Sequence, residues 1–202
     1  MNLRTELPTA ENSSNFNAVA DAVTKAGTTL ENLKAAVAGE TGASAKYAAF
    51  AKAAKEQGFD QLARLWEATS AAEQIHINLE ASLVEAEDSS YTRPTVEAPT
   101  PEAIDLNLIA SANGEIFETS DMYPTFIKKA QEEGHAKAVK VFTRAKLAEA
   151  VHAEKYLEAY NNIDAADDDA YYLCPGCGYI HKGDDFEKCP ICGVPKAKFQ
   201  RF

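Results

Sequence analysis

The chain has 202 residues, of which 46% are hydrophobic and 25% charged, a composition ordinary for a globular protein with one helical core and a small further module. Its net charge of −11 argues against nucleic acid as a partner, because phosphate binding needs clustered Lys and Arg. No apolar run approaches the roughly 18 residues of a membrane span, and the N-terminus lacks the apolar core of a signal peptide. We therefore expect a cytoplasmic protein that binds neither nucleic acid nor membrane.

In chain order, the sequence begins with a polar arm and an Ala/Val pattern that predicts a short leading helix at about 16–28. Two pairs of long helical stretches follow, separated by the proline-bearing segment 88–102, which predicts a crossover loop. The four stretches are predicted at about 30–57, 59–87, 103–133 and 135–162. The expected domains are an N-terminal extension (1–29), a helical bundle (30–163), an acidic linker (164–170) and a cysteine-rich module (171–202).

The two helical pairs repeat each other. Glu40 in the first pair matches Glu115 in the second at an offset of 75 residues, but Tyr47 matches Tyr123 at an offset of 76. One extra residue has therefore entered the third helical stretch, and such an insertion is the usual origin of a π-bulge. Antiparallel pairs joined by a long crossover make a four-helix bundle, so the predicted fold class is mainly α.

Carboxylates occupy positions where a helical core is expected. An ionised carboxylate in an apolar interior is costly, and several together demand a compensating cation. Glu and His at i and i+3 share one helical face. One Glu from each of two helices, with a Glu-x-x-His from each of the other two, is the ligand set of di-iron carboxylate bundles. The candidates are Glu40, Glu73, His76, Glu115, Glu149 and His152. Any single Glu could instead lie at the edge of the apolar face of its helix and reach solvent.

Three further side chains accompany this set. Glu118 lies one turn after Glu115 and has no counterpart in the first pair, where Thr41, Gly42 and Ala43 stand. It coincides with the extra residue, and a bulge would help to turn its carboxylate inward. The phenols of Tyr47 and Tyr123 either donate hydrogen bonds to ligand carboxylates or simply pack in the core.

The four cysteines form two Cys-x-x-Cys knuckles, Cys174/Cys177 and Cys189/Cys192, each followed by a glycine. This spacing indicates a tetrahedral four-thiolate metal site. Two disulfides are the alternative, disfavoured in an intracellular chain. Iron and zinc both accept four thiolates, so the spacing does not separate them.

From about residue 30 to the end, these motifs resemble rubrerythrin, a ferritin-like di-iron bundle followed by a rubredoxin-like domain. The matching runs include Gly114-Glu115-x-x-Glu118, Met122-Tyr123-Pro124 and Tyr179-x-His181. The resemblance implies a peroxidase that reduces hydrogen peroxide to water, with electrons entering through the cysteine-bound iron from a donor protein. It also implies that one iron shifts between Glu118 and His76 with redox state. It further implies a head-to-tail homodimer, with the cysteine-bound iron near the partner's di-iron site, and helix pairs that can be exchanged between subunits.

Three other functions remain open from the sequence. An iron-oxidising storage protein of ferritin type would give the cysteine module no purpose. A non-enzymatic electron carrier, or a scaffold whose tail holds zinc, would need no peroxide chemistry. Oxygen reduction as the main reaction would use the same metal ligands.

Overall fold

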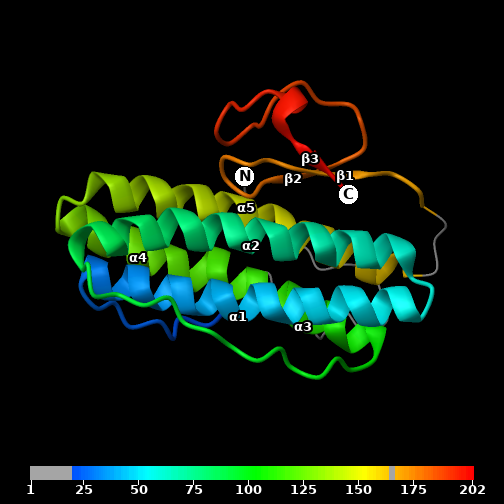
Figure 1. Cartoon of the computed structure of the whole chain (residues 1–202), viewed down its shortest axis with the longest axis horizontal. Coiled ribbons are helices and arrows are strands. Elements are labelled where there is room, and N and C mark those ends of the chain that lie inside the picture. Colours follow the sequence, from blue (N-terminus) through cyan, green and yellow to red (C-terminus); the bar gives the residue numbers. More distant parts are fainter. Residues whose placement is uncertain (1–19, 164–166) are drawn as a thin grey trace.

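A long helical bundle with a small β module on one side makes up the computed structural model, which describes residues 20–163 and 167–202 (Figure 1). Each half of the bundle is a helical hairpin, as the repeat predicts. The first hairpin is α1 (Thr29–Glu56) and α2 (Asp60–Glu87). The second comprises α3 (Ile104–Phe117), the π-helix η2 (Glu118–Met122), α4 (Tyr123–Glu132) and α5 (Ala136–Asn161). The ferritin-like four-helix bundle is thus confirmed.

Local sequence signals define where the helices begin and turn. Thr28 caps α1 in a capping box, in which its side chain accepts from the Glu31 amide while the Glu31 carboxylate accepts from the Thr28 amide. The two hairpins turn at Gly58 and Gly134, whose φ values of 82° and 71° suit glycine and are strained for other residues. These turns bring the helices of each pair together in antiparallel order.

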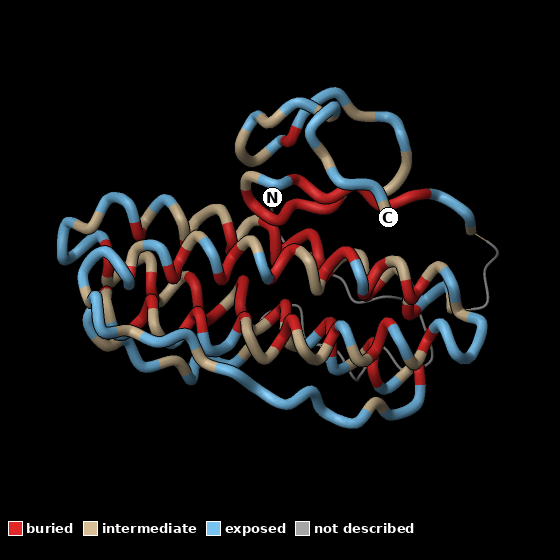
Figure 2. The backbone as a smooth tube through the Cα atoms, viewed as in Figure 1, coloured by how far each residue is buried: buried red, intermediate tan, exposed pale blue. Residues whose placement is uncertain are grey.

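The bundle core lies along the inner faces of the helices, which Figure 2 shows as the buried positions. Trp66 and Phe142, which occupy matching positions of the repeat, are both fully buried. The indole N–H of Trp66 donates to Ser111 Oγ at 3.0 Å, so this large ring is buried without an unpaired donor. The predicted crossover runs between α2 and α3 without helix or strand.

The predicted π-bulge is confirmed, because η2 spans Glu118–Met122 between α3 and α4. The predicted leading helix is wrong over the described part of its range, since residues 20–28, hereafter the leading segment, contain no helix. Three of its backbone amides donate to side chains of η2, among them the Ala20 amide to Ser120 Oγ at 2.8 Å. Residues 16–19 of that prediction lie outside the described residues.

The cysteine-rich module is built on a three-stranded antiparallel sheet with strand order β2-β1-β3. The strands are β1 (Tyr171–Leu173), β2 (Ile180–Lys182) and β3 (Gln200–Arg201), with a 3-10 turn, η3, at Lys196–Lys198. Leu173 and Ile180 are buried in the same hydrophobic cluster as the bundle residues Trp66 and Leu65, so the module packs directly on α2 and α5. No helix among the described residues is long and apolar enough to cross a membrane.

Candidate metal centres

The carboxylates and histidines predicted from the repeat converge in the middle of the bundle. Their ligand atoms form two groups, each with all atoms within 4.8 Å of one another. Glu73 and Glu149 belong to both groups. Carboxylates that reach two sites at once are the feature that distinguishes a paired metal centre from two separate ones. The first group is Glu40, Glu73, His76 and Glu149, and the second is Glu73, Glu115, Glu149 and His152.

Each of the two groups contains one histidine, and the two imidazole rings lie 6.3 Å apart, centroid to centroid. His76 Nδ1 lies 2.7 Å from Glu149 Oε1 and 3.1 Å from Glu73 Oε2. His152 Nδ1 lies 2.7 Å from the other oxygen, Glu149 Oε2, and 3.4 Å from Glu115 Oε2. Both imidazoles therefore turn Nδ1 toward the cluster, and one carboxylate spans the space between them.

Each hairpin contributes a tyrosine that hydrogen-bonds to a glutamate of the other hairpin, in each case the repeat-related glutamate that stands outside the Glu-x-x-His motif. The Tyr47 hydroxyl, on α1, donates to Glu115 Oε1, and the Tyr123 hydroxyl, on α4, donates to Glu40 Oε1. Both phenols are fully buried. Of the two roles left open by the sequence, the geometry favours hydrogen bonding to candidate ligand carboxylates, although both rings also pack in the core.

The electrostatics of the cluster call for cations. Burial raises the pKa of Glu115 to about 8, and repulsion from Glu149 and Glu73 acts in the same direction. Burial and the neighbouring carboxylates also raise the pKa of Glu40 and of Glu118 well above the usual range. Burial alone would raise the pKa of Glu149, but the adjacent His76 and His152 bring it below its usual value.

The donor atoms themselves fit a metal pair. Among the described residues, nearly all the buried side-chain atoms without a hydrogen-bond partner gather in this cluster. A buried acceptor left unpaired costs about 1–3 kcal/mol, more for a charged group, unless something binds it. In the candidate ligands, the atoms with no hydrogen-bond partner outside the cluster are Glu40 Oε2, both oxygens of Glu73 and Glu149, Glu115 Oε2, Glu118 Oε2 and the Nδ1 atoms of His76 and His152.

Glu118 stands apart from the two four-residue groups. It is the first residue of η2 and is 8% exposed, whereas Glu40, Glu73, Glu115 and Glu149 are fully buried. One of its oxygens is buried and unpaired. This placement fits a carboxylate at the edge of the cluster, with one oxygen still available to bind a metal.

Glu80, on α2, is a buried carboxylate that sequence reasoning missed. It is fully buried, and its Oε1 lies 2.9 Å from the Tyr123 hydroxyl, which also contacts Glu40. The repeat hides it, because the matching position in α5 is Tyr156. The helical spacing could have identified it, because Glu80 follows Glu73 by seven residues and therefore lies on the same face of α2.

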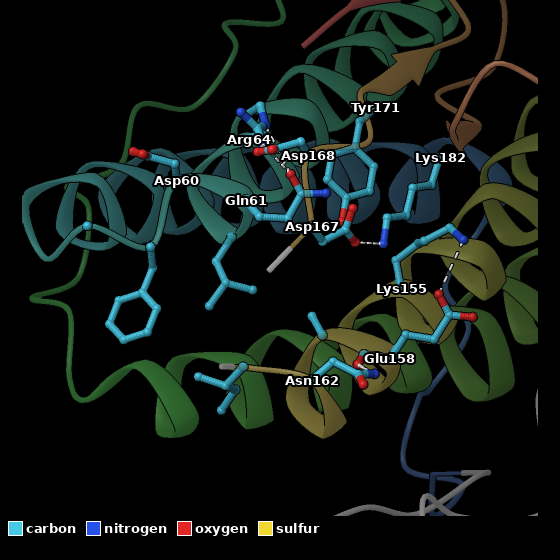
Figure 3. A pocket seen from close by; sticks show the side chains of 15 residues that line it. Asp60, Gln61, Arg64, Lys155, Glu158, Asn162, Asp167, Asp168, Tyr171 and Lys182 are labelled. Atoms are coloured by element: carbon cyan, nitrogen blue, oxygen red, sulfur yellow. Dashed lines mark hydrogen bonds and ion pairs between the residues drawn. The ribbon is translucent and has the colours of Figure 1, made fainter. Parts of the chain in front are cut away.

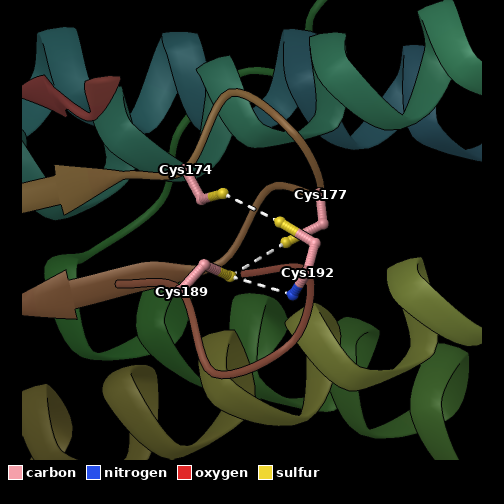
Figure 4. A group of neighbouring side chains, drawn as sticks. All are labelled: Cys174, Cys177, Cys189 and Cys192. Carbon is pink, nitrogen blue, oxygen red and sulfur yellow. Dashed lines mark hydrogen bonds between the residues drawn. The ribbon is translucent and has the colours of Figure 1, made fainter. Parts of the chain in front are cut away.

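The four cysteines come together at the other predicted site (Figure 4). Cys174 Sγ lies 3.4 Å from Cys192 Sγ, and Cys177 Sγ lies 3.4 Å from Cys189 Sγ. These separations far exceed the roughly 2.05 Å of a disulfide bond, so all four are free thiols and the disulfide alternative is not realised. Four sulfurs from two knuckles, all within 4.8 Å of one another, are the donor set of a closed tetrahedral metal site.

The two sites meet through the histidines. His76 Nε2 lies 3.0 Å from the carbonyl oxygen of Cys177, and His152 Nε2 lies 2.8 Å from that of Gly178. A carbonyl only accepts, so each Nε2 carries the proton and each Nδ1 is left free to bind a metal. The first knuckle of the cysteine module thus rests directly on two candidate ligands.

The module makes these contacts with its own chain. The resemblance implied a place near a partner's di-iron site, whereas in this structure the module covers the site of the bundle to which it is joined. The nine residues from 162 to 170 can span about 30 Å when extended, enough to return from the end of α5 to the middle of the bundle.

A hollow of about 750 Å³ lies beside this connection, between the start of α2, the end of α5 and the module (Figure 3). Six of its seven charged side chains form ion pairs: Lys182 with Asp167, Lys155 with Glu158 at 3.4 Å, and Arg64 with Asp168 at 3.9 Å. None of the candidate metal ligands lines it. The hollow therefore marks where the linker joins the module to the bundle, and is separate from the metal centres.

The fold and the two clusters define a class of protein: a ferritin-like bundle with a di-iron carboxylate–histidine site, joined to a rubredoxin-like four-cysteine module. Comparison with protein families agrees with this class. Residues 31–160 match the rubrerythrin family model, and residues 172–200 match the model of the rubrerythrin rubredoxin-like domain. The chain belongs to the rubrerythrin family.

Individual relatives extend this result over the whole chain. The chain is 67% identical to nigerythrin of Nitratidesulfovibrio vulgaris over 202 residues, covering all of both chains. It is 33% identical to rubrerythrin of the same organism over 186 residues, 87% of this chain and 95% of the relative. A solved structure of fully reduced, all-ferrous nigerythrin matches with a TM-score of 0.90 and 67% identity over all of both chains.

Proposed function

We propose that this protein is a non-haem di-iron peroxidase that reduces hydrogen peroxide to two molecules of water, consuming two protons and two electrons. The observation that carries the proposal is the direct contact of both candidate histidine ligands with the first cysteine knuckle, through Cys177 and Gly178. A storage protein has no use for such a contact, whereas an electron-accepting site needs one.

In this proposal Glu73 and Glu149 would contribute to both iron sites, with Glu40 at one and Glu115 and His152 at the other. The iron pair supplies Lewis acidity and two reducing electrons at a water-excluded site. Tyr47 and Tyr123 orient Glu115 and Glu40 by hydrogen bonding. One iron would be held by His76 or by Glu118, at the edge of the cluster, depending on its oxidation state.

The four thiolates would bind a further iron and pass electrons one at a time to the bundle. Cys192 is the one partly exposed thiol of the four, which favours an electron-donor protein docking on that side of the module. Zinc in this site would abolish the relay, because zinc has no redox chemistry. We also propose that the protein works as a homodimer in the cytoplasm, where thiols stay reduced.

Stopped-flow absorbance on fully reduced, iron-loaded protein tests the proposal. We expect peroxide to reoxidise the cysteine-bound iron much faster than oxygen does. An equal response to both oxidants would support oxygen reduction instead. No reoxidation of the cysteine-bound iron by either oxidant would overturn the relay and leave the storage, carrier or scaffold functions.

A further inference from the structure

The leading segment (residues 20–28) is anchored to the π-helix η2 by a compact set of hydrogen bonds. The carboxylate oxygen Asp121 Oδ2 accepts from the Val23 amide at 3.1 Å, the Thr24 amide at 2.9 Å and the Thr24 hydroxyl at 2.7 Å. Asp121 is only 5% exposed. Hydrogen bonds to an ionised acceptor are stronger than neutral ones, so this anchor is more than a loose surface contact.

The same turn is held from its other side by the bundle. The Thr119 hydroxyl donates to the Lys146 carbonyl of α5 at 2.9 Å. The Ser120 hydroxyl donates to the Ile116 carbonyl at 2.5 Å and accepts from the Ala20 amide. Three successive side chains of η2 therefore bind three different parts of the chain.

Glu118 opens this turn, three residues before Asp121. A π-helix is rare and strained relative to an α-helix, and it persists only where surrounding contacts maintain it. Fixing the backbone from residue 119 to residue 121 also fixes the direction from which the Glu118 carboxylate approaches the metal cluster. The repeat supports this link, because the first hairpin has neither the extra residue nor a counterpart of Glu118.

We propose that Asp121 and Thr24 are positioning residues for Glu118, and that the leading segment sets the mobility of the π-turn that carries it. The inference rests on the proposed function only in taking Glu118 as a metal-approaching carboxylate. Neither Asp121 nor Thr24 belongs to the metal-ligand cluster, so both can be changed without removing a candidate ligand.

The test compares T24V and D121N with T143V in the full-length, iron-loaded protein. T24V removes the hydroxyl that donates to Asp121, and D121N removes the charge while preserving side-chain size. T143V is the matched control, because Thr143 Oγ1 donates to the Val139 carbonyl at 2.6 Å within α5. Three quantities are measured: amide hydrogen exchange in residues 117–123, iron content and the Mössbauer spectrum of the di-iron pair in both redox states.

We expect T24V and D121N to retain iron but to speed exchange in residues 117–123 by about tenfold or more. The spectrum of one iron of the pair should change, while T143V should behave as wild type. Faster exchange with an unchanged spectrum would show that the hydrogen bonds anchor the segment without positioning Glu118, and would overturn the proposal. Unchanged exchange would also overturn it, because the leading segment would then not control the mobility of the π-turn. If D121N fails to fold, the milder T24V decides the outcome by the same measurements.

These readouts also separate this inference from the proposed function. Peroxide is absent from the exchange and Mössbauer experiments, so a wild-type protein that fails to reduce peroxide would sink the peroxidase proposal alone. A protein that reduces peroxide rapidly while T24V and D121N leave the spectrum unchanged would sink the positioning role alone.

Discussion

Glu149 lies at the centre of the cluster and Glu118 at its edge, so replacing them is expected to affect metal content and reaction rate differently. Glu149 lies 2.7 Å from both histidines and belongs to both ligand groups, whereas Glu118 belongs to neither. We expect E149A to lose most of the di-iron metal while the cysteine site stays filled. E118A should keep most of its iron but reoxidise with peroxide about tenfold or more slowly.

Metal analysis and stopped-flow absorbance check both variants. Unchanged peroxide turnover in E118A would contradict a role for Glu118 in the reaction. Full iron content in E149A would contradict the shared-carboxylate arrangement.

The metal-free protein should lose stability as the pH rises. Burial raises the pKa of Glu115 and of Glu80 to about 8 in the folded protein, from an ordinary value of 4.5. The folded form thus holds protons that the unfolded form releases, and its stability falls between about pH 4.5 and 8. Each group contributes at most about 1.4 kcal/mol per pH unit.

Thermal unfolding of chelator-treated protein at pH 5 and pH 8 measures this slope. E80Q should reduce it, because a neutral amide can replace the proton-bearing carboxyl group beside Tyr123. Iron loading should reduce it further, because the metal takes the place of the protons on the ligands. A melting temperature that rises from pH 5 to pH 8 in the metal-free protein would contradict the burial of protonated carboxyl groups as the cause.

At this scale the sequence predicted much of the candidate site. The i, i+3 spacing of Glu73 with His76 and of Glu149 with His152, together with the repeat, pointed to side chains that the structure brings into one cluster. Glu80 was missed because Tyr156 interrupts the repeat at its position. The contacts of His76 and His152 with Cys177 and Gly178 were also missed, because helical periodicity carries no information on how a separate module packs.

Among the elements, the helices and the π-helix follow from local pattern and from the changed repeat offset. The leading helix failed for a different reason. Its Ala/Val pattern has helical potential, but the amides of Val23 and Thr24 bind Asp121, nearly one hundred residues away in sequence. Helix propensity, which depends on neighbouring residues, cannot predict a contact between residues so far apart in sequence. Such a contact outweighs the weak helical preference of a short segment.

The two cysteine knuckles offer a matched pair of substitutions. Gly178 and Gly193 have nearly equal φ values, 76° and 79°. A Cβ at Gly178 would collide with the His76 ring, whose Cε1 lies 3.0 Å from the added atom, whereas a Cβ at Gly193 meets nothing within 4 Å. We expect both alanine variants to lose about 1–2 kcal/mol of stability from backbone strain, but only G178A to separate the two metal sites.

The measurement is the rate at which the reduced cysteine-bound iron is reoxidised after peroxide is mixed with the protein. G178A should be several-fold slower than G193A, at equal metal content. Equal rates in the two variants would show that close contact at His76 is not needed for electron transfer.

On the scale of the whole molecule, the question is whether each cysteine module transfers electrons to the bundle of its own chain or to that of a partner subunit. A mixture of E149A, which has a defective bundle, with C174S/C177S, which has a defective module, distinguishes the two arrangements. Because the structure makes the contacts within one chain, co-refolding the two variants is expected to restore no peroxide turnover.

Recovery of roughly a quarter of the wild-type rate would instead show modules exchanged between the subunits of a random dimer, since half of the dimers are mixed and one of their two sites is complete. Light scattering on the same samples gives the oligomeric state. A monomeric wild-type protein would overturn the proposed homodimer.

The hydrogen bonds from His76 and His152 to the first knuckle have a thermodynamic consequence. If a change of oxidation state shifts either imidazole, it alters how tightly the module is seated on the bundle. Linkage is reciprocal for equilibrium quantities, so the seating of the module must alter the reduction potential of the buried pair by the same free energy. Under the proposed function, the module would then both deliver electrons to the di-iron site and modulate its potential. A donor protein that shifts the module on docking would change the potential of the di-iron centre before it transfers any electron.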